Sequence, residues 1–283
     1  MKNPYLPMSV TISKINFENK AKDLKTFDFT FDNPDDAKDF QFICGQFAMI
    51  SIDGIGEAPF GIASSPMEKK IIQFTIKRYP QGLLTTSLHN LSVGDKVGLR
   101  GPLGNGYPMK KIQGQNILIV GGGFALTTLR SVAQYVLHKD NRSNYGRLTM
   151  LAAAREPGEM LYRDDMTEFE KALNTEIIQT IDRPAEDWTH KVGFAAPVLK
   201  EVAPSPKDTY ALICGPPIMI KTCTDVLLEL DFDTDKILNS LEMKMACGIG
   251  KCGRCNVGNK YVCKDGPVFS YKELLELTKG CGL

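Results

Sequence analysis

The sequence predicts three modules in series: an N-terminal antiparallel β-barrel, an α/β domain with a doubly wound parallel sheet, and a small C-terminal cysteine module. Short β-forming segments without a long helix fill the N-terminal part of the chain. Strands then alternate with helical segments, a pattern typical of a parallel sheet. Four of the eight cysteines fall within residues 247–263. We expect the module boundaries at residues 1–109, 110–240 and 241–283.

Length and composition are those of a globular protein with two domains and a small appendage. Apolar residues make up 43% and charged residues 24% of the 283 positions, so the chain can bury a core. The net charge is +1 and no basic stretch stands out, so we expect no nucleic-acid partner. Charges punctuate the N-terminal region and apolar runs are short, so we expect neither a secretory signal nor a membrane span. These features predict a cytoplasmic protein, in a compartment where structural disulfides are rare.

The first module contains five expected strands separated by turn residues. β-Branched and aromatic residues cluster or alternate in each strand. Their regular spacing predicts a closed or nearly closed antiparallel barrel. The stretch GPLGNGYP at 101–108 has three glycines and two prolines and marks the edge of the module. The expected strands are residues 9–15, 26–31, 46–52, 71–78 and 96–101.

The second module alternates strands with helices, which predicts a parallel sheet. The helices are expected near residues 124–138, 159–173 and 217–230. The strands are expected at residues 116–123, 147–154, 175–180, 210–215 and 236–242, the last of these closing the sheet.

A first glycine turn joins a strand to a helix in VGGGFALTTLRS (120–131). Gly121, Gly122 and Gly123 let the backbone approach a pyrophosphate, which the N–H groups and dipole of the following helix would bind. The match to the dinucleotide-binding fingerprint is incomplete, because Leu126 stands where a third glycine is expected. A tight strand-to-helix turn without a ligand is the alternative interpretation.

A second glycine turn, CGPPIMI (214–220), also ends a strand and opens a helix. Pro216 lacks an N–H donor and therefore suits the start of a helix. Ligands of open α/β sheets lie at the carboxyl ends of the strands, where Gly215 and the first glycine turn both fall. Cys214 is then a candidate to face a nicotinamide, and a buried structural thiol is the alternative.

The cysteine module has the spacing C-x4-C-x2-C-x7-C. Cys247, Cys252 and Cys255 match the C-x4-C-x2-C core of plant-type [2Fe–2S] ligation, and Cys263 supplies the fourth thiol. Structural zinc favours two closely paired knuckles, and this stretch has only one. We therefore predict a [2Fe–2S] cluster, with zinc or free thiols as the alternatives. Outside the motif stand Cys44, Cys223 and Cys281, expected to be ordinary buried or terminal thiols.

Side-chain acid–base catalysis has no candidate in this sequence. The three histidines, His89, His138 and His190, lie in no motif, and no arrangement of a nucleophile with a histidine can be assembled from them. We therefore expect no catalytic side chain and a reaction carried out by cofactors.

These motifs together resemble the ferredoxin–NADP reductase superfamily. More narrowly, the chain resembles flavin-containing electron-transfer subunits with a C-terminal [2Fe–2S] module. Those subunits include the B subunit of anaerobic sulfite reductase, the gamma subunit of sulfhydrogenase and the electron-transfer subunit of dihydroorotate dehydrogenase. The likeness covers essentially the whole chain and is strongest in GNGYP (104–108), GPPIMI (215–220), ACGIGKCGRC (246–255) and YVCKDGPVFSY (261–271).

The resemblance implies that the barrel binds FAD. The flavin motif of the superfamily, Arg-x-Tyr-Ser/Thr, aligns with residues 58–66, where Ala58 replaces the arginine and Phe60 the tyrosine. Phe60 would lie against the isoalloxazine, and Ile62, Ala63 and Ser64 would offer backbone groups.

A second flavin motif, GLLTTSL (82–88), departs less from the pattern of the superfamily. It would place Gly82 and Thr85 on the diphosphate. Lys77 or Arg78 would supply the positive charge that Ala58 lacks. Weak or absent FAD binding is the alternative.

The nucleotide is expected to be NAD(H) or NADP(H). The stretch AREPGE (154–159) follows the second strand of the sheet, where the adenosine ribose is usually bound. Arg155 would hold a 2′-phosphate, whereas Glu156 would repel one or bond the ribose diol. The resemblance favours NADH.

The expected function is therefore that of an electron-transfer subunit between NAD(P)H, FAD, a [2Fe–2S] cluster and a catalytic or iron–sulfur partner subunit. The partner is expected to cover the face around Ile249, Lys251 and Arg254. Two alternatives remain at this point: a stand-alone NAD(P)H oxidoreductase with its own acceptor, and a zinc-ribbon protein that senses nucleotides.

Overall fold

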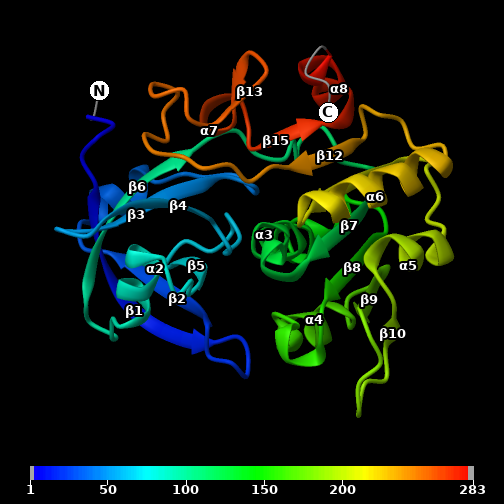
Figure 1. Cartoon of the computed structure of the whole chain (residues 1–283), viewed down its shortest axis with the longest axis horizontal. Coiled ribbons are helices and arrows are strands. Elements are labelled where there is room, and N and C mark those ends of the chain that lie inside the picture. Colours follow the sequence, from blue (N-terminus) through cyan, green and yellow to red (C-terminus); the bar gives the residue numbers. More distant parts are fainter. Residues whose placement is uncertain (1–2, 280–283) are drawn as a thin grey trace.

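The computed structural model describes residues 3–279, in which two large sheets lie side by side (Figure 1). The first sheet is antiparallel and follows the order β4-β3-β6-β1-β2-β5. Five of its strands match the expected segments, and β4 was not expected as a strand. The elements of this module are β1 (Met8–Phe17), β2 (Leu24–Phe31), α1 (Pro34–Asp39), β3 (Phe47–Ile52), β4 (Gly56–Gly61), β5 (Ile72–Lys77), α2 (Leu83–His89) and β6 (Lys96–Leu103).

Alternating apolar residues form the inner face of this sheet. Phe27 and Phe29 in β2 are fully buried, because side chains two residues apart on a strand lie on the same face. They pack with Val10 and Ile12 of β1 and with Phe74 of β5. This apolar core holds the first module together.

The barrel that was expected to be closed or nearly closed is open along one seam. Strands β4 and β5 are the two edges of the sheet, and no strand ladder joins them within residues 3–279. After Gly61 the chain turns toward α3 (Leu126–Leu137), so closely that a Cβ on Gly61 would lie 2.4 Å from Thr128 Cγ2. Beyond this turn, the Ala63 N–H donates to the Gln73 carbonyl of β5 (2.8 Å). The seam therefore lies against the second module.

The second sheet follows the order β10-β9-β8-β7-β11-β12-β15, and its strands are parallel from β10 to β12. Every residue of β8 is buried, as expected for a strand covered on both faces. The chain order reverses between β7 and β11, which makes the carboxyl ends of these two strands the expected ligand crevice. The strands are β7 (Asn116–Gly122), β8 (Leu148–Ala154), β9 (Thr175–Ile181), β10 (Lys191–Val192), β11 (Thr209–Cys214), β12 (Ile237–Ser240) and β15 (Val268–Ser270).

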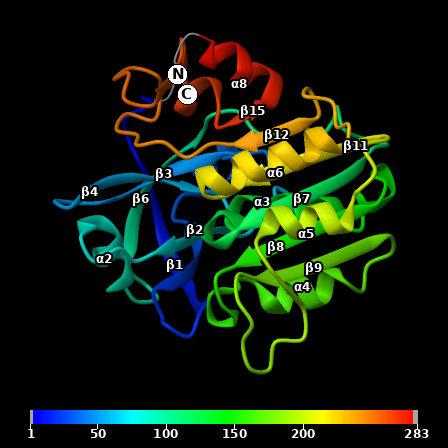
Figure 2. The same ribbon diagram turned by 45° about the vertical axis from the view of Figure 1, so that its right-hand side comes forward.

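Helices cover both faces of this sheet, which confirms the doubly wound architecture (Figure 2). Helices α3 and α4 (Arg163–Phe169) pack on one face, while α5 (Ala195–Val202) and α6 (Pro217–Glu229) pack on the other. Helix α4 is shorter than expected, because Tyr162 adopts a left-handed backbone conformation just before it. No helix within the described residues is both long and apolar enough to cross a membrane.

The third module is joined to the second sheet. Strand β15 pairs antiparallel with β12, so the expected last strand of the sheet has a further neighbour. With only three residues, β15 is too short to show a periodic pattern in the sequence. The module also contains β13 (Asn256–Val257), β14 (Lys260–Tyr261), α7 (Val262–Asp265) and α8 (Tyr271–Thr278). The cysteine loop lies between β12 and β13.

Candidate functional site

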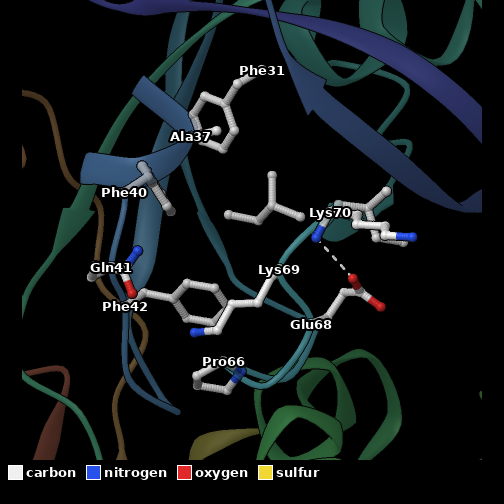
Figure 3. Close-up of a pocket in the computed structure, with 11 residues that line it drawn as sticks. Phe31, Ala37, Phe40, Gln41, Phe42, Pro66, Glu68, Lys69 and Lys70 are labelled. Carbon is white, nitrogen blue, oxygen red and sulfur yellow. Dashed lines mark hydrogen bonds between the residues drawn. The ribbon is translucent and has the colours of Figure 1, made fainter. Parts of the chain in front are cut away.

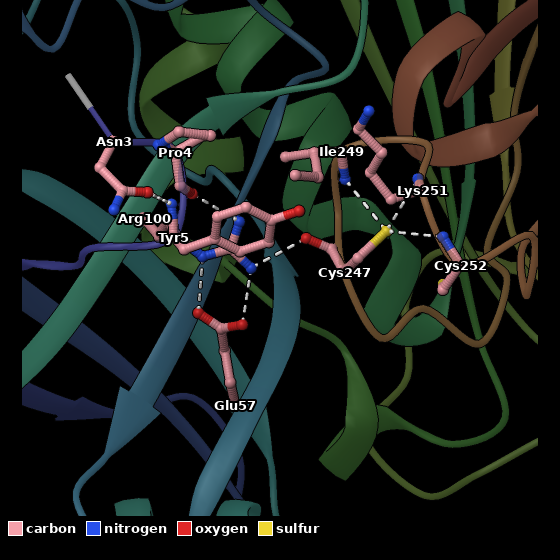
Figure 4. Close-up of polar contacts among 9 residues, drawn as sticks. All are labelled: Asn3, Pro4, Tyr5, Glu57, Arg100, Cys247, Ile249, Lys251 and Cys252. Atoms are coloured by element: carbon pink, nitrogen blue, oxygen red, sulfur yellow. Dashed lines mark hydrogen bonds and ion pairs between the residues drawn. The ribbon is translucent and has the colours of Figure 1, made fainter. Parts of the chain in front are cut away.

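The first thiol of the cysteine loop is surrounded by backbone donors. The N–H groups of Ile249, Lys251 and Cys252 point at Cys247 Sγ, at 3.5, 3.3 and 3.4 Å (Figure 4). Burial alone would raise the pKa of Cys247, but these donors outweigh it and lower that pKa to about 6. The loop therefore favours the thiolate, which is the form that ligates iron.

The remaining thiols are held by the same kind of contact. Gly250 donates its N–H to Cys263 Sγ (3.1 Å), and Cys263 donates its own N–H to Cys255 Sγ (3.4 Å). Burial, followed by the neighbouring Cys255 thiol, raises the pKa of Cys263 to about 12. Ligation of a metal displaces the proton from such a thiol.

The four thiols form two pairs. Cys247 lies within hydrogen-bonding reach of Cys252, and Cys255 lies within that reach of Cys263. Across residues 3–279, no three Cys, His, Asp or Glu side chains surround a single metal-ion position. Two thiol pairs with N–H groups directed at the sulfurs fit a two-iron cluster with four cysteine ligands. The first pair is open to solvent at Cys252, whereas the second pair is buried.

Glycines allow the loop to follow this path. Gly248, Gly250 and Gly253 have φ angles of 71°, 73° and 73°, in the left-handed region that favours glycine. A Cβ on Gly248 would also lie 2.9 Å from Leu103 Cδ1 of the first module. The loop is therefore turned tightly and pressed against the barrel.

Asn105 fastens the cysteine module to the end of β6. Its side-chain amide donates to the carbonyls of Asp265 (2.9 Å) and Val268 (2.7 Å), and its side-chain oxygen accepts from the Val268 N–H (2.9 Å). The backbone N–H of Asn105 donates to the Gly266 carbonyl (2.5 Å). The GNGYP stretch noted in the sequence thus has a structural role at this junction.

Strand β3 separates the cysteine module from the barrel core. Phe47 and Met49 pack in one apolar cluster with Cys255 and Cys263, and alternate residues of β3 face the barrel interior. One of those inward residues, Ala48, pairs with Phe60 of β4. A single strand therefore lies between the predicted cluster ligands and the expected flavin segment.

The expected flavin segment lies at the open seam of the barrel. Phe60 is half-buried against the barrel core, and Ile62, Ala63 and Ser64 are buried. The N–H groups of Ile62 and Ala63 already donate to barrel carbonyls, and Ser64 Oγ accepts from the Gln73 N–H (3.1 Å). The structure brings the four residues together, and their contact with flavin stays a prediction.

The second expected flavin stretch forms a compact turn before α2. A Cβ on Gly82 would lie 2.4 Å from Thr85 Oγ1, so a side chain at this position would displace the Thr85 hydroxyl. Thr85 donates its hydroxyl to the Gly82 carbonyl (3.2 Å). Lys77 is partly buried beside Asp23 (3.8 Å), whereas Arg78 is exposed. Of the two expected cations, Arg78 is thus the freer to meet a diphosphate.

The two glycine turns meet at the switch point of the parallel sheet, as expected. Cys214 pairs with Gly121 across the ends of β11 and β7. Methionine 219 of α6 covers both turns: a Cβ would lie 2.4 Å from its sulfur at Gly122 and 2.3 Å from its Cε at Gly215. Gly123 has a φ of 55°, in the left-handed region that favours glycine, and this residue begins the turn that leads into α3. Met219, whose type gives no signal in the sequence, was not expected at this site.

Cys214 is buried rather than open to the crevice. Its thiol lies 3.7 Å from Thr128 Oγ1 and 3.6 Å from the Ser240 carbonyl, and burial raises its pKa to about 12. This placement favours the structural interpretation of Cys214. The neighbouring Pro216 precedes α6 and is exposed at the same edge of the sheet.

A cleft of about 330 Å³ opens where the second strand of the sheet ends. It lies between the β1–β2 turn and the loops that follow β8 and β9. Arg155 precedes it and is exposed. Its charged lining is mainly acidic, with Asp23, Glu156, Glu159 and Glu186 against Lys20.

Arg130 of α3 joins the two large modules and was not expected from the sequence. Its guanidinium forms an ion pair with Asp165 and donates to the Ala63 carbonyl (3.2 Å) and Gln73 Oε1 (2.7 Å). It also lies over the Tyr162 ring, 4.7 Å from the centroid. This buried cation therefore fixes the seam of the barrel to the nucleotide sheet.

A second, smaller cavity lies in the first module, and none of the expected flavin residues lines it. It measures about 30 Å³ and lies among Phe31, Phe40 and Phe42, with Lys69 and Lys70 at its side (Figure 3). This is room for about one water, so it is not a cofactor site.

Comparison with known families agrees with this division of the chain. Residues 14–107 match the oxidoreductase FAD-binding domain, and residues 119–225 match the oxidoreductase NAD-binding domain. Residues 242–275, which contain all four cysteines of the motif, match the iron–sulfur cluster binding domain of dihydroorotate dehydrogenase B. The fold and the site thus define a flavin- and nicotinamide-dependent oxidoreductase with an iron–sulfur module. The iron–sulfur match sets the zinc-ribbon alternative aside.

Relatives of similar length narrow this class. Sulfhydrogenase 1 subunit gamma of Pyrococcus furiosus is 38% identical over 280 residues, covering 96% of this chain and 94% of that protein. A dihydroorotate dehydrogenase B (NAD(+)) electron transfer subunit of Thermococcus kodakarensis is 34% identical, covering 91% and 94%. The chain belongs to the family of electron-transfer subunits that contains these two proteins.

Solved structures confirm the fold. The NADH-dependent reduced ferredoxin-NADP oxidoreductase, studied for flavin-based electron bifurcation, superposes with a TM-score of 0.74 at 25% identity, over 99% of this chain and 95% of that chain. A cytochrome P450 reductase of Amycolatopsis superposes with a TM-score of 0.69 at 19% identity, over 82% and 68%. The second likeness shows the fold alone.

Proposed function

We propose that this chain carries electrons between NAD(H) and a partner subunit of sulfhydrogenase or sulfite reductase type. When bound, FAD accepts a hydride from the nicotinamide and the [2Fe–2S] cluster carries single electrons. The chain positions these groups and contributes no acid or base. The observation that carries the proposal is the seating of the cysteine loop on β3, one strand from the flavin segment.

Two further parts of the proposal concern cofactor contacts and location. Gly82 and Thr85, with Arg78 as the nearby cation, are proposed to hold the FAD diphosphate. The domains are proposed to divide at residues 1–109, 110–240 and 241–283. A cytoplasmic location is supported by Cys44, Cys214 and Cys223, the described cysteines outside the cluster motif, which form no disulfide.

The acidic cleft supports NADH as the nucleotide. Glu156 and Glu159 follow β8 and Glu186 follows β9, at the carboxyl edge where the adenosine ribose is bound in such sheets. A 2′-phosphate would bring further negative charge next to these carboxylates, whereas a 2′-hydroxyl can donate a hydrogen bond to one of them.

We therefore expect kcat/KM for NADH to exceed that for NADPH at least about tenfold, the effect of about 1.4 kcal/mol. Glu156→Gln should lower the ratio of kcat/KM for NADH to that for NADPH, because it removes one of the carboxylates that repel the 2′-phosphate. Glu168→Gln, on the exposed side of α4, is the matched control and should leave the ratio unchanged. Steady-state dye reduction with each nucleotide measures the ratio, and a higher value for NADPH in the unaltered protein would contradict the assignment.

The face around Cys252 is the proposed docking site for the partner. Residues 243–264 contain five basic and no acidic side chains. Of these, Lys244, Lys251, Arg254 and Lys264 are exposed. An acidic surface on the partner would complement this face and steer association toward the exposed thiol pair.

Charge reversal at Lys251 or Arg254 should weaken complex formation about tenfold or more at low salt, and less at high salt. Dye reduction should not change, because neither side chain lies in the flavin or nucleotide modules. Lys207→Glu, at the opposite end of β11, is the control. Binding to the purified partner subunit measures the effect. Equal affinity of the unaltered and charge-reversed proteins would exclude this face.

A further inference from the structure

Arg100 is a buried cation that links the first cluster ligand to the barrel. It lies on β6 with 6% of its side chain exposed. Its guanidinium donates to both carboxylate oxygens of Glu57 on β4 (3.0 and 2.6 Å), to the Cys247 carbonyl (2.9 Å) and to the Pro4 carbonyl (3.1 Å) (Figure 4). Three separate parts of the chain therefore converge on one side chain.

The burial of this charge has a cost that its contacts must offset. A buried guanidinium is stable only when it is paired and its remaining N–H groups are satisfied. Glu57 supplies the counter-charge in a two-pronged contact, which is the strong geometry for an arginine. The N–H directed at Cys247 is thus part of a fixed arrangement.

Cys247 is consequently held from two sides. Loop N–H groups hold its sulfur, and Arg100 holds the carbonyl of its own peptide. A positive charge at this position favours the reduced cluster, which carries one more negative charge than the oxidised cluster. The carboxylate of Glu57 offsets part of that effect.

We propose that Arg100 and Glu57 form a charge pair that positions Cys247 and sets the reduction potential of the cluster. Arg100 acts through the Cys247 peptide and is a positioning residue. The inference rests on the proposed cluster at Cys247, which iron and sulfide analysis of the unaltered protein tests separately.

The pair predicts shifts of opposite sign. Arg100→Met leaves the Glu57 charge behind and should make the cluster harder to reduce, lowering the ratio of reduced to oxidised cluster about tenfold at fixed potential. This corresponds to about 59 mV for a one-electron couple. Glu57→Gln leaves the arginine charge and should shift the ratio the other way. Arg100→Lys keeps the charge and should restore the potential, with an altered electron paramagnetic resonance (EPR) line shape because one ammonium cannot reproduce the fork.

Potentiometric titration followed by EPR measures these ratios in proteins with equal iron and sulfide content. Lys96→Met is the matched control, because it removes an exposed cation from the same strand, beside Asp32 (2.9 Å), and should cause no shift. If Arg100→Met does not fold, Glu57→Gln alone decides the question. A Glu57→Gln potential equal to or below that of the unaltered protein would overturn the proposal, as would shifts of the same sign in both variants.

Discussion

Cys252→Ser is expected to abolish the [2Fe–2S] cluster while FAD binding and NADH-dependent dye reduction continue. Cys252 is one of the four predicted ligands, and a serine hydroxyl is a poor replacement for a thiolate. Its side chain is exposed, so the substitution leaves the packing intact, whereas Cys255 is buried in the apolar cluster on β3. Iron and labile sulfide should fall from about two each per chain to near zero.

The control for this experiment is Cys223→Ala. This thiol lies on the buried face of α6 and belongs to no ligand set, so its removal should leave iron, sulfide and visible bands unchanged. Two results would contradict the assignment: full iron and sulfide in the Cys252→Ser protein, or stoichiometric zinc without sulfide in the unaltered one.

Arg130→Met should lower the free energy of unfolding by about 3 kcal/mol, because it leaves a partly buried carboxylate and a partly buried amide oxygen without their partner. Methionine fills a similar volume, so the effect isolates the charge and its hydrogen bonds. Asp165 and Gln73 are the groups that lose their partner. Urea denaturation followed by circular dichroism measures the change.

The matched control is Arg147→Met. Arg147 pairs with Glu176 at the surface (2.7 Å), with 61% of the arginine side chain exposed, and such pairs contribute about 1 kcal/mol or less. Equal losses in both variants would show that Arg130 does not hold the seam between the barrel and the nucleotide sheet.

The sequence predicted the parts of the fold that repeat or alternate. Hydrophobic patterns within single segments of the sequence predicted five barrel strands, the main strands of the parallel sheet and the ends of α3 and α6. The four-cysteine spacing is equally local. Strands β4 and β15 escaped prediction because the first is rich in glycine and proline for its length and the second has three residues.

The residues that join the modules could not be predicted. Arg130, Asn105 and Arg100 act on groups distant in the chain, and each reads as an ordinary polar residue in its own segment. Cys214 shows the converse: its local motif suggested an open crevice, while the fold places its thiol against Thr128 and β12. The domain match confirms FAD binding to the barrel module, and the residues that contact the cofactor remain predictions.

The measurement that tests the central claim most directly is anaerobic turnover of the isolated chain with NADH. The protein should reduce an artificial dye at a substantial rate and leave sulfite, polysulfide and protons unreduced, because its three matched domains bind FAD, NAD and an iron–sulfur cluster, and the terminal acceptor is proposed to bind the partner subunit. When the partner subunit is added, the acceptor that binds to that subunit should be reduced with NADH. If the isolated chain reduced sulfite as fast as it reduces dye, the assignment as an electron-transfer subunit would be wrong.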